Sequence, residues 1–251
     1  MNASDVVEAL ELPERSNVDR RVPKKLLLEN GAPTSADKRF INDGVEELIW
    51  VAALKPTTIG VLEFREDVRE YLEIAVLHLM LRPHAKSARL AELIHRAVPY
   101  PVLLLSDGEH TELSLAHKRW SLNERSKVVL DDEIIGIEWN EAKDGAHRAA
   151  FCNALRIGRQ PHGSLYELYQ GWMDAIQALE AARLSRTFLI PASTEYAIMR
   201  RAALKECAFL DSEIARLRAA AVREKQIARQ VELNLELKRV EAAFAAARVK
   251  I

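Results

Sequence analysis

The chain has 251 residues, with 36 Lys and Arg against 37 Asp and Glu, so its formal net charge is -1. Hydrophobic residues make up 49% and charged residues 29%, which excludes a disordered chain and predicts a folded one with its own core. The balanced charge excludes a uniformly basic nucleic-acid-binding protein, although it leaves room for a local basic patch.

The cysteines and the N-terminal residues are both compatible with a reducing compartment. Cys152 and Cys207 lie far apart and outside any paired motif. That spacing excludes a zinc site built on thiolates and argues against a disulfide framework. The first residues are acidic and lack the apolar segment of a signal peptide, and no apolar run approaches the roughly 20 residues of a membrane helix. We therefore expect a cytoplasmic protein without a membrane contact.

Residues 1–45 look irregular and polar, apart from two short helices. Pro23 stands where a first helical turn tolerates proline, and Gly31 ends this helix. Thr34 lies in the N-cap region of a second helix, which runs towards Asn42.

Residues 46–139 carry the signals of a sheet. A helix is expected at 88–97, because apolar residues recur there at helical spacing and a proline follows. The remaining apolar or alternating runs have the length of strands: 48–54, 58–62, 71–81, 101–105, 111–118 and 128–137. The order of strands, helix and strands predicts a mixed sheet with few covering helices.

Residues 141–251 look helical almost throughout. A break at 161–164 separates two helices, with Ser164 as N-cap and Glu167 completing a capping box. The second of these helices carries one apolar stripe, made of Leu165, Leu168, Tyr169, Trp172, Ile176 and Leu179. Ser193 or Thr194 can cap the helix that follows.

The last segment has the 4-3-4 apolar spacing of a coiled-coil seam. This spacing occurs first in Leu210, Ile214, Leu217 and Ala221 and again in Leu233, Leu237, Val240, Phe244, Ala247 and Ile251. Ile227 and Val231 lie out of phase between the two sets, which indicates a stutter. We predict one helix from about residue 210 to the end, roughly 60 Å long at 1.5 Å per residue. Its stripe would pack on itself in a dimer, on the preceding helix or on another protein.

The pattern as a whole predicts an α+β fold in three parts. A mixed-sheet domain with few helices spans 1–140, a helical unit 141–199 and a long coiled-coil helix 200–251. Residues 200–251 hold 12 Lys or Arg and 7 Asp or Glu, a net charge of +5 against -6 for the remainder. An acidic partner is therefore expected at the tail.

Signatures of catalysis are absent from the sequence. It contains no HExxH, GxxxxGK[ST], GxGxxG or GxSxG motif, so we predict no cofactor and no metal. His78 lies on the apolar face of its strand. We interpret it as a core histidine with a hydrogen-bond partner, with a role as a metal ligand as the alternative.

A nuclease of the restriction type would need an acidic residue and then Glu-x-Lys on a following strand. Asp67 followed by Glu73 is the candidate, but Ala75 occupies the lysine position, and only Lys118 on a later strand might replace it in space. Otherwise Glu73 is a carboxylate at a strand end that pairs with a neighbouring Lys or Arg.

Two basic clusters are candidates for contact with nucleic acid. They comprise Arg20, Arg21, Lys24 and Lys25 near the N-terminus and Lys118 and Arg119 farther along the chain. Trp120 offers the second cluster a ring on which a base can stack. Both clusters are equally compatible with simple solvated faces.

Several short segments, taken in their order along the chain, resemble the bacterial domain-of-unknown-function family 4391. They are Val22-Pro23-Lys24, Val45 to Trp50, Leu54 with Thr58-Ile59, Glu73-Ile74, Val98-Pro99-Tyr100-Pro101, Glu224-Lys225-Gln226, Val231-Glu232-Leu233-Asn234 and Glu236-Leu237-Lys238. The resemblance implies no activity for any residue. It implies a setting, because genes of this family often lie beside helicase and DNA methyltransferase genes in clusters that resemble restriction or phage-defence systems.

The first hypothesis is therefore a non-catalytic interaction or accessory subunit of a bacterial DNA-processing system. It would dock on itself, as a homo-oligomer, or on a helicase or methyltransferase-type subunit by burying the seam residues Leu233, Leu237, Val240, Phe244 and Ile251. Asn234 beside the seam either fixes the register or faces solvent. The alternatives are a metal-dependent nuclease or nuclease subunit, with Glu73 and Asp67 as ligands, and a nucleic-acid-binding module that uses the N-terminal basic cluster.

Overall fold

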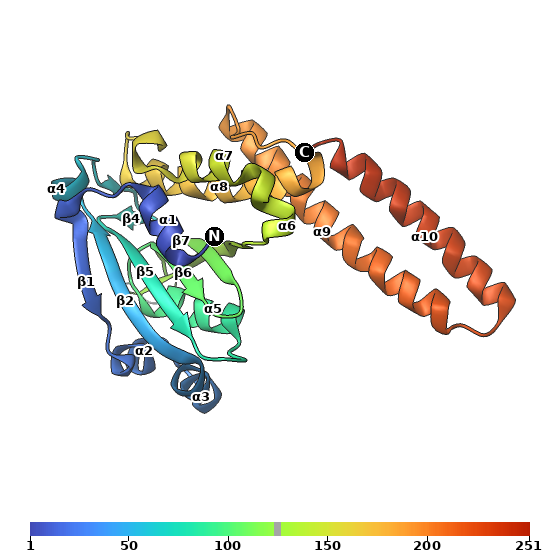
Figure 1. The fold of residues 1–251 in the computed structure, drawn as a ribbon, viewed down its shortest axis with the longest axis horizontal. Helices are drawn as coiled ribbons and strands as arrows, with labels where there is room; N and C mark the ends of the chain where they lie inside the picture. Colours follow the sequence, from blue (N-terminus) through green and yellow to red (C-terminus); the bar gives the residue numbers. More distant parts are fainter. Residues whose placement is uncertain (123–126) are drawn as a thin grey trace. The chain divides into compact units, whose positions relative to one another are not determined.

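The computed structural model describes residues 1–122 and 127–251 (Figure 1). It divides the chain into two compact units, Met1–Ile176 and Gln177–Ile251. The first unit holds a six-stranded mixed sheet with helices, and the second is helical. The predicted α+β class with helices towards the C-terminus is confirmed, whereas the three-part division stays a prediction.

The first 45 residues hold more regular structure than expected. The two predicted helices are present as α2 (Lys24–Asn30) and α3 (Ser35–Gly44), and Thr34 Oγ1 accepts a hydrogen bond from the Asp37 amide at 3.1 Å. In addition, the structure contains α1 (Ala3–Leu10), a 3-10 turn at Glu14–Ser16 and β1 (Asn17–Arg21). β1 was not predicted, because its sequence, NVDRR, has neither an apolar run nor an alternating pattern.

The main sheet has the strand order β1-β2-β5-β6-β7-β8. Its further strands are β2 (Val45–Leu54), β5 (Ile74–Leu81), β6 (Val102–Asp107), β7 (Thr111–Trp120) and β8 (Val128–Glu138). Among the described strands of this sheet, β5 and β6 pair in parallel and the other neighbours are antiparallel, and α5 (Ser87–Ala97) connects β5 with β6. β3 (Phe64–Arg65) and β4 (Glu70–Tyr71) form a separate two-stranded ribbon.

The strand expected at 58–62 is wrong, because this segment begins with a helical turn, α4 (Pro56–Ile59). Thr58 Oγ1 accepts a hydrogen bond from the Lys55 amide at 2.9 Å and so caps the turn. Gly60 ends it in a left-handed conformation (φ 75°), which glycine adopts without steric cost.

Both faces of the sheet are covered. One core lies between β2, β5 and β6 and the helices α2, α3 and α5, and its centre includes Leu48, Leu77 and Leu104. α1 contacts β6, and Tyr169 bonds to the backbone of β6 and β7. Because both faces are covered, β7 is buried continuously from Leu113 to Lys118 and lacks the polar face that its alternation predicted.

After the sheet the chain is helical, as predicted. α6 (Glu141–Asp144), α7 (Arg148–Leu155) and α8 (Leu165–Ser185) follow, with 3-10 turns at Gly145–His147 and Ile157–Arg159. The Ser164 cap is confirmed, since its Oγ accepts the Glu167 amide at 3.2 Å. The predicted stripe is fully buried: Leu165, Leu168, Tyr169, Trp172, Ile176 and Leu179.

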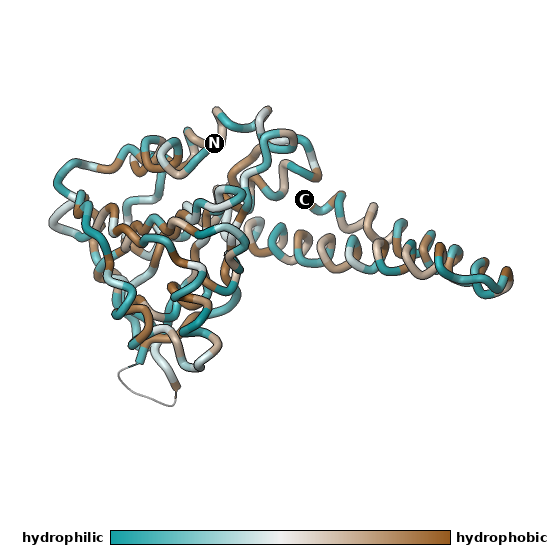
Figure 2. Tube along the Cα trace, turned by 60° about the horizontal axis from the view of Figure 1, so that its bottom comes forward, coloured by the Kyte–Doolittle hydropathy of each residue, from teal (hydrophilic) through white to brown (hydrophobic). Residues whose placement is uncertain are grey.

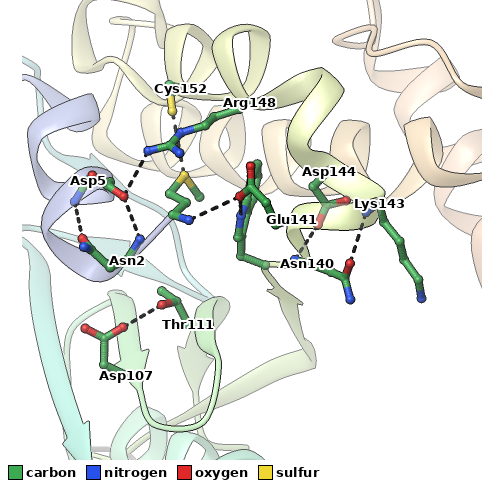
Figure 3. A network of polar contacts seen from close by, with 12 residues as sticks. Asn2, Asp5, Asp107, Thr111, Asn140, Glu141, Lys143, Asp144, Arg148 and Cys152 are labelled. Atoms are coloured by element: carbon green, nitrogen blue, oxygen red, sulfur yellow. Dashed lines mark hydrogen bonds and ion pairs between the residues drawn. The ribbon is translucent and has the colours of Figure 1, made fainter.

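Polar contacts at the beginning of α7 connect it to α1 (Figure 3). Asn2 and Asp5 exchange the hydrogen bonds of a capping box at the start of α1. The same Asp5 carboxylate accepts a hydrogen bond from Arg148 at 3.1 Å, and Arg156 pairs with Glu11. Two exposed ion pairs therefore connect α1 with the two ends of α7.

The second unit contains two long helices, and the single helix predicted from Leu210 to the end is wrong. α9 (Thr194–Arg223) and α10 (Ile227–Arg248) are separated by a turn in which Glu224 and Gln226 have extended backbone conformations. The Glu224 carboxylate accepts hydrogen bonds from the Lys225 and Gln226 amides at 2.8 and 2.9 Å. The helices lie antiparallel, side by side (Figure 1). The apparent stutter in the apolar spacing thus marks a turn.

Candidate functional site

The predicted docking stripe on α10 is already engaged within the chain. Leu233, Leu237, Val240 and Phe244 are half-buried, as is the final Ile251. Of the predicted seam residues on α9, Ile214, Leu217 and Ala221 are buried and Leu210 is half-buried. The sequence left three packing partners possible for the seam: a second copy of the chain, the preceding helix or another protein. In the structure the seam packs on the preceding helix, α9. The seam residues therefore pack on α9 within the chain, their predicted role in docking a partner stays a prediction, and Asn234 is exposed beside them.

Polar contacts at both ends fix the register of the α9–α10 hairpin. Arg218 pairs with Glu241 at 2.7 Å, and Lys250 pairs with Glu206 at 3.1 Å. Tyr196 donates a hydrogen bond to the backbone carbonyl of Ile251 at 3.0 Å. Since exposed ion pairs contribute little to stability, the apolar seam stabilises the hairpin and these contacts select its register.

The hairpin also has apolar side chains outside the seam. Ile227, Val231 and Leu235 are 78, 52 and 55% exposed and follow each other at intervals of four residues along α10. Val222, at the end of α9, is 84% exposed. We call these four residues the outer stripe. Figure 2 shows hydrophobic and hydrophilic residues alternating along both helices up to the turn. Sequence reasoning noticed Ile227 and Val231 only as a defect in the seam.

Three basic residues lie in and next to the turn between α9 and α10. Arg223, Lys225 and Arg229 are exposed, and none forms an ion pair among the residues that the structure describes. Gln230 donates to the Ala221 carbonyl at 3.2 Å and links the two helix ends. The end of the hairpin therefore combines exposed apolar side chains with unpaired positive charge.

The N-terminal basic cluster gathers only in part. Arg20 and Arg21 line a pocket between β1, α2 and the segment after α5. Lys24 is half-buried nearby, and its pKa is lowered by burial and then by the charges of Arg82 and Arg21. Lys25 is exposed and pairs with Glu29 at 3.7 Å.

The second basic cluster is not a surface patch. Lys118 is 3% exposed, and its ammonium group donates to the backbone carbonyls of His95 and Val98. Burial lowers the pKa of this lysine to about 7. Arg119 pairs with Asp131 at 3.2 Å. The ammonium group of Lys118 therefore cannot reach a phosphate, which corrects that part of the nucleic-acid prediction.

His78 has the hydrogen-bond partner expected of it, but it is half-buried and does not belong to the core. Its Nε2 lies 3.1 Å from Asp107 Oδ2. The other oxygen of Asp107 accepts a hydrogen bond from Thr111 at 2.8 Å, a contact visible in Figure 3. Asp107 thus holds His78 at the carboxyl end of the parallel strand pair.

Glu73 shows the contact expected of a strand-end carboxylate, because it pairs with Lys55 at 3.0 Å. The residue is 5% exposed, and its second oxygen has no hydrogen-bond partner. Asp67 is exposed, and Ala75 is buried at the position of the missing lysine. Within residues 1–122 and 127–251, no group of three His, Cys, Asp or Glu side chains could hold a metal ion. The described residues therefore provide no set of metal ligands that would support the nuclease alternative.

A buried polar network that the sequence did not reveal lies beneath α8. His117 Nε2 is 2.8 Å from Gln170 Oε1, and the Tyr71 hydroxyl lies 2.5 Å from His117 Nδ1. Because Gln170 Oε1 only accepts, His117 donates from Nε2 and accepts from Tyr71 at Nδ1. Burial raises the pKa of Tyr71. These partners are distant in sequence, so no local motif could indicate them.

Comparison with known families identifies the chain. A family model described as domain of unknown function (DUF4391) matches residues 10–244. The chain belongs to this family. The DUF4391 match begins at the end of α1 and reaches into α10, so it includes the sheet and the hairpin.

Other comparisons add no relative to the DUF4391 assignment. No curated protein and no solved structure matches the chain. Among the residues that the structure describes, no helix is both long and apolar enough to cross a membrane.

Proposed function

We propose that this chain is a non-catalytic docking subunit whose α9–α10 hairpin binds a partner protein through the outer stripe. The observation that carries the proposal is the exposure of the stripe: Val222, Ile227, Val231 and Leu235 are 52–84% exposed. The seam between the helices is filled, so these side chains do not serve the hairpin's own packing. Exposed apolar side chains that recur on one face of a helix, as Ile227, Val231 and Leu235 do, are typical of a protein interaction site.

Charge supports an acidic partner. Residues 200–251 carry a net charge of +5, and Arg223, Lys225 and Arg229 are exposed at the turn. Basic residues around an apolar centre favour a protein surface with acidic residues around its own apolar patch. A nucleic-acid backbone is a poorer match, because phosphates would give the exposed apolar side chains of the outer stripe no apolar surface to contact.

The proposed setting is the cytoplasm of a bacterium, in a DNA-processing system of the restriction or phage-defence type. The gene neighbourhoods of the DUF4391 family support this setting. A helicase or methyltransferase-type subunit is the first partner to test, and a second copy of the chain is the next. In either complex the hairpin supplies the contact and the partner supplies the chemistry.

Affinity purification of the tagged full chain, expressed with the neighbouring genes of its native operon, tests the proposal. Leu235→Glu places a charge in the outer stripe, and Leu62→Glu makes the same change at a 69% exposed leucine in the first unit. We expect Leu235→Glu to reduce partner recovery about tenfold or more, since a central interface residue contributes on the order of 2 kcal/mol. Leu62→Glu should leave recovery unchanged. Equal recovery with both variants would contradict the proposal.

A further inference from the structure

α2 is held against the rest of its unit at both ends. Before it, the Val22 amide donates to the Leu48 carbonyl at 2.8 Å. After it, Gly31 lies so close to α5 that an added Cβ would be 2.7 Å from Ala97 Cβ. Between these fixed ends lies a pocket of about 350 Å³. This volume lies in the range of small-molecule sites, which is about 300–1,000 Å³.

The interior of the pocket is almost entirely apolar. β2 and β5 supply its floor, and α2 and the segment after α5 supply its walls: Leu26, Leu27, Leu48, Trp50, Ala75, Leu77, Val98 and Pro99. Asn30 also lines the pocket, but its amide nitrogen already donates to the Leu26 carbonyl at 2.9 Å. Such a floor accepts hydrocarbon and offers few partners to the polar edge of a nucleobase.

The mouth of the pocket is basic. Arg20 on β1 is the cross-strand neighbour of Trp50, so both side chains leave the sheet on the same face. Arg20 forms no ion pair among the described residues, whereas Arg21 pairs with Glu47 at 3.2 Å. Burial, and then the charges of Arg82 and Arg21, lower the pKa of Lys24, which is the sequence neighbour of the pocket residue Pro23. An anion is therefore favoured where an apolar ligand would enter.

We propose that this pocket binds a small amphiphilic anion, with its hydrocarbon body on Trp50 and Leu77 and its carboxylate or phosphate group on Arg20. The guanidinium group of Arg20 can donate two parallel hydrogen bonds to either head group. Both parts of the ligand are needed, because the floor contributes no polar recognition and the mouth contributes no apolar contact. All the lining residues of the pocket belong to the first unit.

Isothermal titration calorimetry of the full chain with decanoate tests this assignment. Decyl phosphate distinguishes the two head groups, decanol removes the charge and inorganic phosphate removes the hydrocarbon. Arg20→Gln removes the anion contact, and its matched control is Lys25→Gln, which removes a cation that does not line the pocket and pairs with Glu29. Leu26→Glu places a negative charge on a half-exposed pocket wall.

We expect decanoate or decyl phosphate to bind the unmodified chain and decanol and inorganic phosphate to bind at least about tenfold more weakly. Arg20→Gln and Leu26→Glu should each weaken binding about tenfold, and Lys25→Gln should leave it unchanged. The assignment is overturned if neither amphiphile binds, if decanol binds as tightly as they do, or if Arg20→Gln and Lys25→Gln have equal effects. Salt-dependent binding of single-stranded DNA, weakened equally by both Gln variants without any amphiphile binding, would instead assign the cluster to nucleic acid.

Discussion

The side chain of Lys118 on β7 donates a hydrogen bond to the backbone carbonyl of His95 in the last turn of α5. The same ammonium group donates to the carbonyl of Val98, the C-cap residue. The last carbonyls of a helix lack partners within it, and the helix dipole places partial negative charge there. Lys118 therefore fixes the end of α5 on the sheet, 20 residues or more away in sequence.

The burial of Lys118 predicts a dependence of stability on pH. Its pKa falls from 10.5 to about 7 in the folded chain, so between these values the unfolded chain binds more protons than the folded one. The free energy of unfolding should therefore rise with pH across this window, with a contribution on the order of a few kcal/mol. Denaturant unfolding at pH 7 and pH 9 measures this rise. Lys118→Met should show a smaller one, and equal rises in both proteins would exclude Lys118 as its source.

The contacts of Tyr169 predict that removal of its hydroxyl group lowers the stability of the fold. The hydroxyl of this fully buried residue accepts the Ala116 amide at 2.8 Å and donates to the Val102 carbonyl at 2.7 Å, so it bridges β6 and β7. Tyr169→Phe should lower the free energy of unfolding by about 1–3 kcal/mol, because two buried backbone groups lose a partner. Tyr100→Phe, at a partly exposed tyrosine, should change it by less than about 0.5 kcal/mol. Indistinguishable values for the two variants would show that the bridge contributes nothing.

The close contact of Gly31 with α5 predicts that a larger residue at this position destabilises the fold. An alanine Cβ there would lie 2.7 Å from Ala97 Cβ and 2.8 Å from the Leu93 carbonyl oxygen, so α2 or α5 would have to move. We expect Gly31→Ala to destabilise the chain by about 1–3 kcal/mol. At Gly158 an added Cβ meets nothing within 4 Å, and Gly158→Ala should be neutral or slightly stabilising. Thermal unfolding of both variants decides the point, and a neutral Gly31→Ala would mean that the two helices do not touch.

Substitutions of Leu237, in the seam, and Leu235, in the outer stripe, distinguish the two faces of α10. Leu237 is half-buried between the helices, whereas Leu235 is 55% exposed. Leu237→Glu should destabilise the hairpin by about 1–3 kcal/mol, because it places a charge in an apolar contact. Leu235→Glu should cost less than about 0.5 kcal/mol. Circular dichroism during thermal unfolding measures both, and equal losses of helix stability would contradict the assignment of the two faces.

Local signals in the sequence predicted local structure well. Ser164 and Ser193 cap the helices that their positions indicated, and the Pro23 and Gly31 pair delimits α2. These features depend only on backbone conformation within a few residues, so a sequence pattern can express them.

Contacts between segments that are distant in sequence could not be predicted from local patterns. Lys118 looked like part of a surface cluster because its partners His95 and Val98 reach it only through the fold. The turn after Arg223 contains no Gly or Pro, and an apolar 4-3-4 seam has the same spacing in one long helix as in two antiparallel ones. The outer stripe could be recognised only once the seam was seen to be filled.

Hydrogen exchange of the full chain, alone and in the captured complex, tests the docking proposal most directly. If the outer stripe is the contact, amides between residues 222 and 236 should exchange more slowly in the complex, because a bound partner suppresses opening of the hairpin end. Slower exchange confined to the sheet unit, residues 1–176, with no change in the hairpin, would contradict it.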